Sequence, residues 1–302
     1  MSTETAAAAD SAAAARPLAS DLLALTKPRI ISLLLVTAVM PMYAAGSPDI
    51  GTVVAVMLGG YLMAGGANAV NMYFDRDIDH VMARTRTRPI PSGRMTPQAV
   101  MAFGIASATA ATFLLGRFVN VLSAALALGG FYAYVFVYTR WLKRSTPQNI
   151  VLGGAAGAFP PLVGWAAVTN TVDLRAVLLF LIVFYWTPPH FWALALNKQV
   201  DYGRAGVPMA PNAWGTRETI DQMLWYSVLL VALTLIPTTI GMFGIVYQVA
   251  AILLGGIFLH GAWRVWVQRD TGAWSAPAWK LYKFSLLYLA LLFAAMAVDR
   301  HL

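Results

Sequence analysis

Residues 52–79 read TVVAVMLGGYLMAGGANAVNMYFDRDID, and this stretch decides the fold class. It begins as an apolar run of about 20 residues, the length of an α-helix that crosses the hydrocarbon core of a bilayer. It ends in Asn71, Asp75 and Asp79, which follow one another at intervals of four residues. On a helix this spacing places the three side chains on one face. The stretch therefore predicts a membrane-spanning helix with a polar stripe at one end.

The composition extends this prediction to the whole chain. Of the 302 residues, 59% are hydrophobic and 11% are charged, whereas soluble domains carry about 25% charged residues. The absence of cysteine excludes disulfides, thiolate metal sites and cysteine nucleophiles. The sequence predicts an all-α polytopic membrane protein with nine transmembrane helices around a central cavity. The expected spans are 29–46, 52–73, 98–116, 119–138, 150–168, 174–195, 222–243, 246–266 and 281–298.

A single transmembrane domain is expected over residues 21–302. Residues 1–20 are rich in Ala, Ser and Thr, and they lack the basic and apolar regions of a signal peptide. We expect them to form a disordered or loosely helical tail.

Basic residues are divided unevenly between the two sides of the membrane. With a cytoplasmic N-terminus, 18 of the 21 Lys and Arg residues are cytoplasmic, which leaves Arg117, Arg175 and Arg300 outside. Cytoplasmic loops of membrane proteins carry such an excess, so the net charge of +8 requires no nucleic-acid partner. We expect a multi-pass protein of the bacterial cytoplasmic (inner) membrane, with its C-terminus outside and its active site on the cytoplasmic face.

The end of the second span predicts a metal-bound diphosphate. Carboxylate and amide oxygens suit Mg²⁺, which usually shares them with substrate phosphates, so we expect Asn71, Asp75 and Asp79 to bind Mg²⁺. Arg84 and Arg88 follow in the next loop, and guanidinium groups match phosphate oxygens. The alternative is a solvated helix end beside arginines that only orient the protein.

A second polar region follows the sixth span. Asp201 is a further candidate metal or diphosphate ligand, and Lys198 lies three residues before it. Pro188 and Pro189 are expected to kink or break the span, which is tolerated where the backbone lines a cavity.

Aromatic rings and a histidine flank the two prolines. Tyr185, Trp186, Phe191 and Trp192 present ring faces that suit a cationic intermediate, the alternative being lipid contact or an interfacial belt. His190 is the histidine best placed for an active-site contact, the alternative being helix packing.

Two further features lie in the loop after the fourth span and in the fifth span. Lys143 and Arg144 either complete the diphosphate site or serve only as an orientation signal. Gly153, Gly154 and Gly157 are expected to let the fifth span pack closely on a neighbour.

These residues resemble the intramembrane prenyltransferases, a superfamily with an Asn-x-x-x-Asp-x-x-x-Asp motif. The resemblance covers nearly the whole chain from Leu25 onward, and it is most specific for the branch that acts on heme. The segments that carry it are TKPRI (26–30), DRDID with RT (75–79, 84–85), LKRSTPQNI (142–150), PPLVGW (160–165), PHF (189–191) and DYGRAGVPM (201–209).

The resemblance implies an activity. It implies that a farnesyl group passes from farnesyl diphosphate to a vinyl group of heme B, with addition of water, to give heme O and diphosphate. It further implies Mg²⁺ as cofactor and association with downstream heme-modifying or oxidase-assembly proteins. The residues it assigns are Asn71, Asp75, Asp79, Lys198 and Asp201 to catalysis, with all but Lys198 binding metal; Lys27, Arg29, Arg84, Arg88, Lys143 and Arg144 to diphosphate; and Tyr185, Trp186, His190, Phe191 and Tyr202 to heme.

The sequence admits alternatives for the second metal and for the acceptor. Asp201 is followed four residues later by Ala205, where many members of the superfamily have a second aspartate, so the ligands of a second metal are undetermined. The acceptor could be another aromatic or tetrapyrrole compound. A transporter would place acids near mid-span, whereas these lie at one face. A heme-binding assembly factor would need no diphosphate site.

Overall fold

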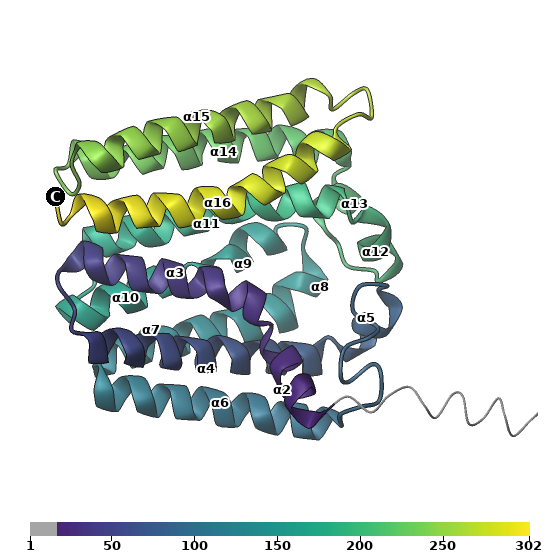
Figure 1. Cartoon of the computed structure of the whole chain (residues 1–302). Coiled ribbons are helices and arrows are strands. Elements are labelled where there is room, and N and C mark those ends of the chain that lie inside the picture. The colour runs from purple at the N-terminus through teal and green to yellow at the C-terminus, as the bar shows by residue number, and fades with distance from the viewer. Residues whose placement is uncertain (1–16) are drawn as a thin grey trace, which may run out of the picture.

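The structure of the protein is a computed structural model, and it describes residues 17–302 (Figure 1). Within these residues, nine helical segments are long and apolar enough to cross a membrane. They are α3 (Pro28–Ala45), α4 (Ile50–Phe74), α6 (Pro97–Phe118), α7 (Val121–Tyr132) continued by η1 (Ala133–Leu142) and α8 (Lys143–Ser145), α9 (Asn149–Gly157) with α10 (Phe159–Thr169), α11 (Leu174–Leu196), α14 (Thr216–Thr239), α15 (Ile245–Val267) and α16 (Ser275–Asp299). The shorter helices are α2 (Leu18–Thr26), α5 (Arg76–Val81), α12 (Gln199–Arg204) and α13 (Ala210–Ala213).

The nine predicted spans are confirmed in the described part of the chain, including the two short breaks near Arg117 and Gly244. Spans 7 and 9 begin earlier than expected, at Thr216 and Ser275. Hydropathy detects only the apolar part of a helix, and these two helices continue into polar sequence. Of the expected tail, residues 1–16 lie outside the described residues, and α2 begins at Leu18.

Three spans differ internally from a regular α-helix or from the prediction. The fourth passes from α7 into η1, a π-helix of 10 residues, and the fifth is divided at Ala158 between α9 and α10. Of the predicted kink or break in the sixth, the break is wrong, because α11 continues through Pro188 and Pro189. Proline is tolerated inside a transmembrane helix when packed neighbours compensate for the lost hydrogen bonds, and α11 is packed on α9, α14 and α16.

The spans pack around a closed circuit that follows the chain order. Each span contacts the next, from α3 through α4, α6, α7, the α9–α10 pair, α11, α14 and α15 to α16, and α16 packs back on α3. Two large clusters of buried apolar side chains result, one centred on α11, α14, α15 and α16 and the other on α3, α4, α6 and α7. The circuit is compatible with the expected central cavity, which stays a prediction.

The glycines of α9 allow close contact at two of the three predicted positions. A Cβ atom at Gly153 would lie 2.3 Å from the Tyr138 ring, and one at Gly154 would lie 2.9 Å from Thr187. A Cβ atom at Gly157 would meet no atom within 4 Å. Close packing of α9 on η1 and α11 therefore requires the first two glycines.

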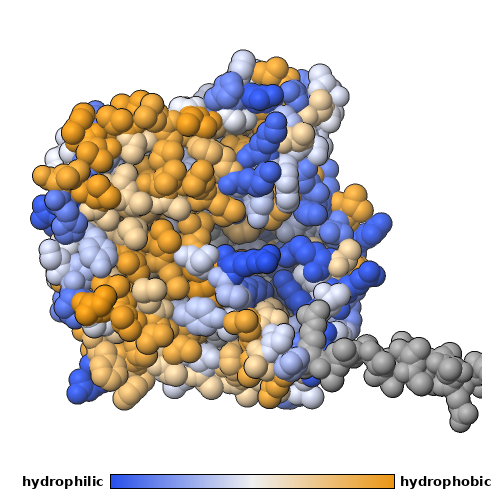
Figure 2. All heavy atoms as spheres, in the orientation of Figure 1, coloured by the Kyte–Doolittle hydropathy of each residue, from blue (hydrophilic) through white to orange (hydrophobic). Residues whose placement is uncertain are grey.

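Polar and apolar surfaces are separated along the helix axes. Figure 2 shows hydrophobic side chains over the flank of the bundle and hydrophilic ones gathered at the end where α2, α5, α12 and α13 lie in Figure 1. Such a distribution is that of a multi-pass membrane protein, with lipid around the flank and water at this polar end. The polar end is also where the predicted acidic motif lies.

Candidate active site at the polar end

The acidic motif lies at the junction between α4 and α5. Asp75 ends α4, and the helical hydrogen bonds continue across it, from the Asp75 amide to the Asn71 carbonyl (2.9 Å) and from the Asp79 amide to the Asp75 carbonyl (2.8 Å). The expected spacing along one face is therefore preserved. All three side chains are buried, with residue exposures of 4% for Asn71, 1% for Asp75 and 2% for Asp79.

Asp75 lies at the centre of a polar network. Its Oδ2 accepts hydrogen bonds from Asn71 Nδ2 (2.8 Å) and Lys143 Nζ (2.5 Å). Its Oδ1 has no hydrogen-bond partner in the described part of the chain, and the Arg144 guanidinium lies 3.8 Å from it. A buried carboxylate oxygen without a partner is costly, which suits an oxygen that a ligand would complete.

Asp79 is bound by the loop that follows α5. Arg88 Nη1 donates to both Asp79 oxygens, at 2.9 and 2.7 Å. The Thr85 hydroxyl donates to the Asp79 carbonyl at 3.0 Å. These contacts fold the loop that carries Arg88 back over the acids. Arg88 and Asp79, which the sequence predicted to act at one site, therefore form an ion pair.

Lys27 reaches the same network from the junction of α2 and α3. Its Nζ donates to the amide oxygens of Asn68 (3.2 Å) and Asn71 (3.3 Å). Its backbone adopts the left-handed conformation, with φ 55°, which is uncommon for a residue other than glycine and directs the chain between the helices. Burial lowers the pKa of Lys27 well below its usual range, and the charge of Arg88 lowers it further, against the opposing effect of the carboxylates.

Two polar residues of the network were not predicted. Thr139 of η1 accepts a hydrogen bond from Asn71 Nδ2 (3.1 Å) and donates to the Tyr134 carbonyl five residues earlier (2.8 Å). Asn68 of α4 accepts from Lys27 and donates to the Thr26 carbonyl (2.9 Å). Both side chains are buried, and the available signal was a polar residue within an apolar span.

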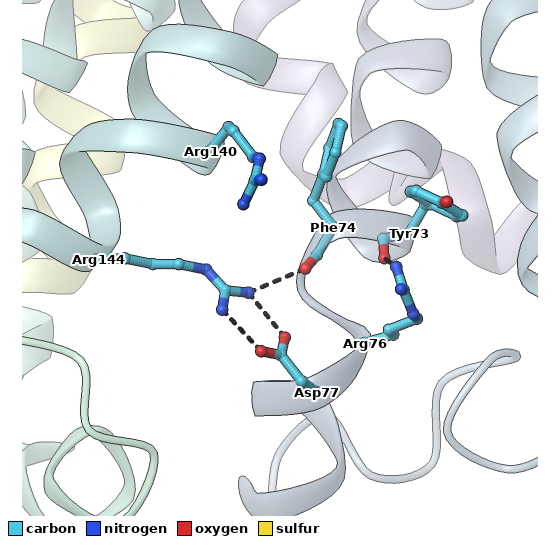
Figure 3. A pocket seen from close by; sticks show the side chains of 6 residues that line it. All are labelled: Tyr73, Phe74, Arg76, Asp77, Arg140 and Arg144. Atoms are coloured by element: carbon cyan, nitrogen blue, oxygen red, sulfur yellow. Dashed lines mark hydrogen bonds and ion pairs between the residues drawn. The ribbon is translucent and has the colours of Figure 1, made fainter.

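The outer side of the network is formed by Asp77 and Arg144. Arg144 donates to both Asp77 oxygens (2.6 and 2.7 Å) and to the Phe74 carbonyl (2.9 Å), as Figure 3 shows. The hydrogen bonds from Arg144 lower the pKa of Asp77 to about 2. Arg144 thus spans from the exposed Asp77 to within ion-pair distance of Asp75.

Among the residues after span 6, Tyr202 approaches the arginine loop. Burial raises the pKa of Tyr202, while the charges of Arg84 and Arg88 oppose the shift. The charge of Asp201 also acts on Tyr202. In the part of the chain described, neither Asp201 nor Lys198 forms a side-chain hydrogen bond or an ion pair, so their roles stay predictions.

The remaining predicted diphosphate ligand, Arg29, lies apart from the network. Its side chain is exposed on the first turn of α3, and no ion pair involves it among the described residues. The structure therefore brings Arg88, Lys143 and Arg144 to the acids and Lys27 to the amide of Asn71, and it leaves Arg29 at the surface.

His190 and Trp186 lie in the contact between α11 and α16. His190 Nδ1 is 2.6 Å from the Ser285 hydroxyl, and Trp186 Nε1 donates to the Ser285 carbonyl at 2.8 Å. The His190 ring stacks on Trp186, with 4.2 Å between centroids, and lies 4.8 Å from the Tyr282 ring. Aromatic rings and one hydroxyl thus hold the histidine in place. This arrangement is compatible with a contact to heme and with a role in helix packing.

The other two aromatic side chains of the predicted acceptor site differ in exposure. Tyr185 is partly buried against the rings of Phe184 (5.3 Å) and Tyr226 (6.0 Å). Phe191 is 36% exposed. Neither contacts the acids through a hydrogen bond or ion pair in the described residues.

The amide and carboxylate oxygens at α4 and α5 suit a hard cation when they are taken together. Within the described residues, no three His, Cys, Asp or Glu side chains lie close enough to form a metal site. Asn71 adds an amide oxygen, and Asp75 and Asp79 add carboxylates that are now neutralised by Lys143 and Arg88. Oxygen donors in this number suit an ion that also takes ligands from a substrate, as Mg²⁺ does.

The family can be assigned from the sequence over most of the chain. Residues 32–297 match the model of the UbiA prenyltransferase family. The chain belongs to this family. The acidic network described above lies within the matched region, at the end of α4.

Several UbiA-family relatives are named protoheme IX farnesyltransferase. The chain is 54% identical to that of Roseiflexus sp. RS-1 over 94% of its length, but covers only 53% of the relative. It is 50% identical to that of Symbiobacterium thermophilum, covering 92% of this chain and 93% of the relative. The chain therefore spans about half the length of the first relatives and nearly all of others.

Solved structures have the same fold at low identity. A digeranylgeranylglyceryl phosphate synthase superposes with a TM-score of 0.72 at 18% identity, covering 93% of this chain and 98% of that one. A UbiA homolog from Archaeoglobus fulgidus, bound to DMAPP and Mg²⁺, superposes with a TM-score of 0.65 at 14% identity, covering 92% and 99%. These matches establish the UbiA fold.

Proposed function

We propose that the protein transfers the farnesyl group of farnesyl diphosphate to a vinyl group of heme B, with addition of water, to give heme O and diphosphate. The observation that carries this proposal is the buried network in which Asp75 and Asp79 face Lys143 and Arg88. Such a network can bind a diphosphate together with its metal. The choice of farnesyl and heme rests on the relatives named protoheme IX farnesyltransferase.

Mg²⁺ fits the donors present. Asn71, Asp75 and Asp79 would hold it, since they supply amide and carboxylate oxygens, and Asp75 Oδ1 has no hydrogen-bond partner in the described part. When bound, the ion neutralises charge on the diphosphate oxygens. Binding of Mg²⁺ and DMAPP by the homolog from Archaeoglobus fulgidus supports this assignment.

The cationic side chains have a second role in this proposal. Lys143 and Arg88 now neutralise carboxylates, and Lys27 binds amide oxygens. In the presence of the substrate, these three side chains would bind the diphosphate and stabilise the charge that develops as it leaves. The acids and the cations therefore act as one unit.

The reaction requires no nucleophile from the protein. The bond between farnesyl C1 and the diphosphate oxygen breaks, and its electron pair leaves with the diphosphate. The vinyl group of heme supplies the electrons of the new carbon–carbon bond to C1. Water then adds to the resulting cation beside the porphyrin and loses a proton. The absence of cysteine is compatible with this route.

We place the heme near His190, Tyr185, Trp186, Phe191 and Tyr202. This assignment rests on the resemblance to the heme-specific branch and on the aromatic surroundings of His190. We also propose that the polar end faces the cytoplasm of a bacterial inner membrane. The excess of basic residues in the loops at this end supports that orientation.

The activity can be tested on the purified protein. Incubation with farnesyl diphosphate, heme B and Mg²⁺ should give a product with the mass of heme O and one equivalent of diphosphate. Removal of Mg²⁺ with EDTA should stop both, and its return should restore both. If heme B gives no product but another aromatic acceptor does, with release of diphosphate, the choice of heme is contradicted. Binding of heme without any diphosphate release would contradict enzymatic function.

Thr139→Val should lower kcat about tenfold, the equivalent of one lost hydrogen bond to a catalytic group. The substitution keeps the side-chain volume but removes the hydroxyl that accepts from Asn71 Nδ2, so Asn71 loses its orientation. Turnover of heme B measures the effect, and Thr139→Ser should restore most of it. A matched control is Thr112→Val, which removes a hydroxyl bonded to the Ala108 carbonyl within α6. Equal kcat for both valine variants would contradict the role of Thr139.

His190→Ala should raise KM for heme about tenfold and change KM for farnesyl diphosphate less than about twofold. The reason is that His190 lies among the rings of α11 and α16, whereas the diphosphate network lies on α4 and α5. His260→Ala, which removes an exposed histidine of α15, is the control. Equal changes in the two KM values would favour a helix-packing role for His190.

A further inference from the structure

A second polar site lies on the outer side of the α4–η1 contact. It is a pocket of about 360 Å³ at the polar end of the bundle, shown in Figure 3. A volume of this size is sufficient for a small ligand or a headgroup. Its lining residues are Tyr73, Phe74, Arg76, Asp77, Arg140 and Arg144.

The charges of this pocket do not balance. Its one carboxylate, Asp77, is occupied by both nitrogens of the Arg144 fork. In the described part of the chain, neither Arg76 nor Arg140 lies within ion-pair distance of a carboxylate. Two arginines with free donors therefore flank the pocket.

Aromatic rings hold these two arginines in place. Arg76 donates to the Tyr73 carbonyl (2.7 Å), and its guanidinium lies 4.6 Å from the Tyr73 ring centroid. The Arg140 guanidinium lies 5.9 Å from the Phe74 ring centroid. Both contacts are of the cation–π type, and they leave most guanidinium nitrogens available to an anion.

The pocket continues into a surface that faces lipid. Phe74 contacts Phe136 of η1, with ring centroids 6.4 Å apart, and Phe136 stacks on Tyr132 at 5.3 Å. Tyr132, Phe136 and Trp141 are exposed by 54%, 46% and 64%, respectively. An apolar strip along η1 thus leads from the flank of the bundle to the two arginines.

We propose that this pocket binds the phosphate group of an anionic phospholipid, with the acyl chains lying along the η1 strip. Arginine forks match phosphate oxygens, and basic pockets between transmembrane helices bind anionic headgroups. The strip distinguishes a lipid from a soluble anion, because only the lipid has apolar chains to cover it. The pocket adjoins the acidic network on its outer side and shares Arg144 with it, since Arg144 lies between Asp77 and Asp75.

The proposal can be tested by lipid binding to the delipidated protein, measured by native mass spectrometry. The probes are phosphatidylglycerol and phosphatidylcholine with identical acyl chains. Arg76→Gln combined with Arg140→Gln should weaken phosphatidylglycerol binding about tenfold or more and leave phosphatidylcholine binding unchanged. The matched control combines Arg117→Gln with Arg300→Gln, two exposed arginines at the far ends of α6 and α16, and should bind as the unmodified protein does.

Three results would overturn the proposal. Unchanged phosphatidylglycerol binding by the Arg76 and Arg140 double variant would exclude the pocket. Equal binding of the two lipids by the unmodified protein would exclude recognition of the anionic headgroup. Full competition by inorganic phosphate at the concentration of the lipid would identify a soluble-anion site. The last two measurements use the unmodified protein, so they do not depend on folding of a variant, and none of the three depends on the proposed enzymatic activity.

Discussion

Asp75→Asn is expected to lower farnesyl transfer on the order of a hundredfold to a thousandfold, the range seen when one group that stabilises transition-state charge is removed. Asp75 is the point at which Asn71, Lys143 and Arg144 meet. The amide keeps the shape of the side chain but loses the charge that would hold Mg²⁺. Heme O formation and diphosphate release, each measured against Mg²⁺ concentration, should fall together.

The choice of asparagine and of the control matters for Asp75. Both substitutions remove the charge opposite the buried Lys143 ammonium, but alanine also removes the oxygen that accepts its hydrogen bond, so loss of activity in an alanine variant could reflect unfolding. Asp270→Asn makes the same chemical change on an exposed acid that pairs loosely with Arg217 (3.3 Å), and it should leave turnover unchanged. If Asp75→Asn and Asp270→Asn turn over heme equally, Asp75 does not bind the metal.

Gly164→Ala is expected to destabilise the protein by about 3 kcal/mol, at the upper end of the usual cost of overpacking. A Cβ atom at Gly164 would lie 1.7 Å from the Ala38 carbonyl oxygen. That atom belongs to the backbone of α3, so no side-chain rotation relieves the contact, and α3 and α10 must separate. Thermal unfolding of the detergent-solubilised protein should show a clearly lower Tm.

The control for Gly164 is a glycine with free space inside another span. A Cβ atom at Gly256 of α15 would meet no atom within 4 Å. Alanine favours helix over glycine by up to about 1 kcal/mol, so Gly256→Ala should keep or slightly raise the Tm. An unchanged Tm for Gly164→Ala would mean that α3 and α10 can move apart at little cost.

Much of the fold could be predicted because the bilayer imposes a length and an apolar composition on each span. The nine spans follow from this constraint, including the brief interruption at Arg117. Hydropathy does not report backbone hydrogen bonding, however. It therefore missed the π-helix η1 and the division at Ala158, and the prolines of α11 suggested a break that packing prevents.

The candidate site shows the same division between local and long-range information. The interval of four residues predicted that Asn71, Asp75 and Asp79 share a face, because helical periodicity is local. Nothing in that interval specifies that Lys143 binds Asp75 or that Arg88 binds Asp79. The lysine lies 68 residues beyond Asp75 along the chain, and only the packing of η1 beside α4 brings them together.

By itself, the sequence determined a membrane-embedded all-α protein with an acidic stripe at the polar end of its second span. The physical reasons are the length of the hydrocarbon core and the period of the α-helix, both of which act within a single segment. Only the tertiary structure decided which cation neutralises which acid, that Asn71 donates a hydrogen bond to Thr139, and that Arg76 and Arg140 line one pocket. These pairings depend on how helices distant in the chain pack together, and the side chains of one segment do not encode that packing on their own.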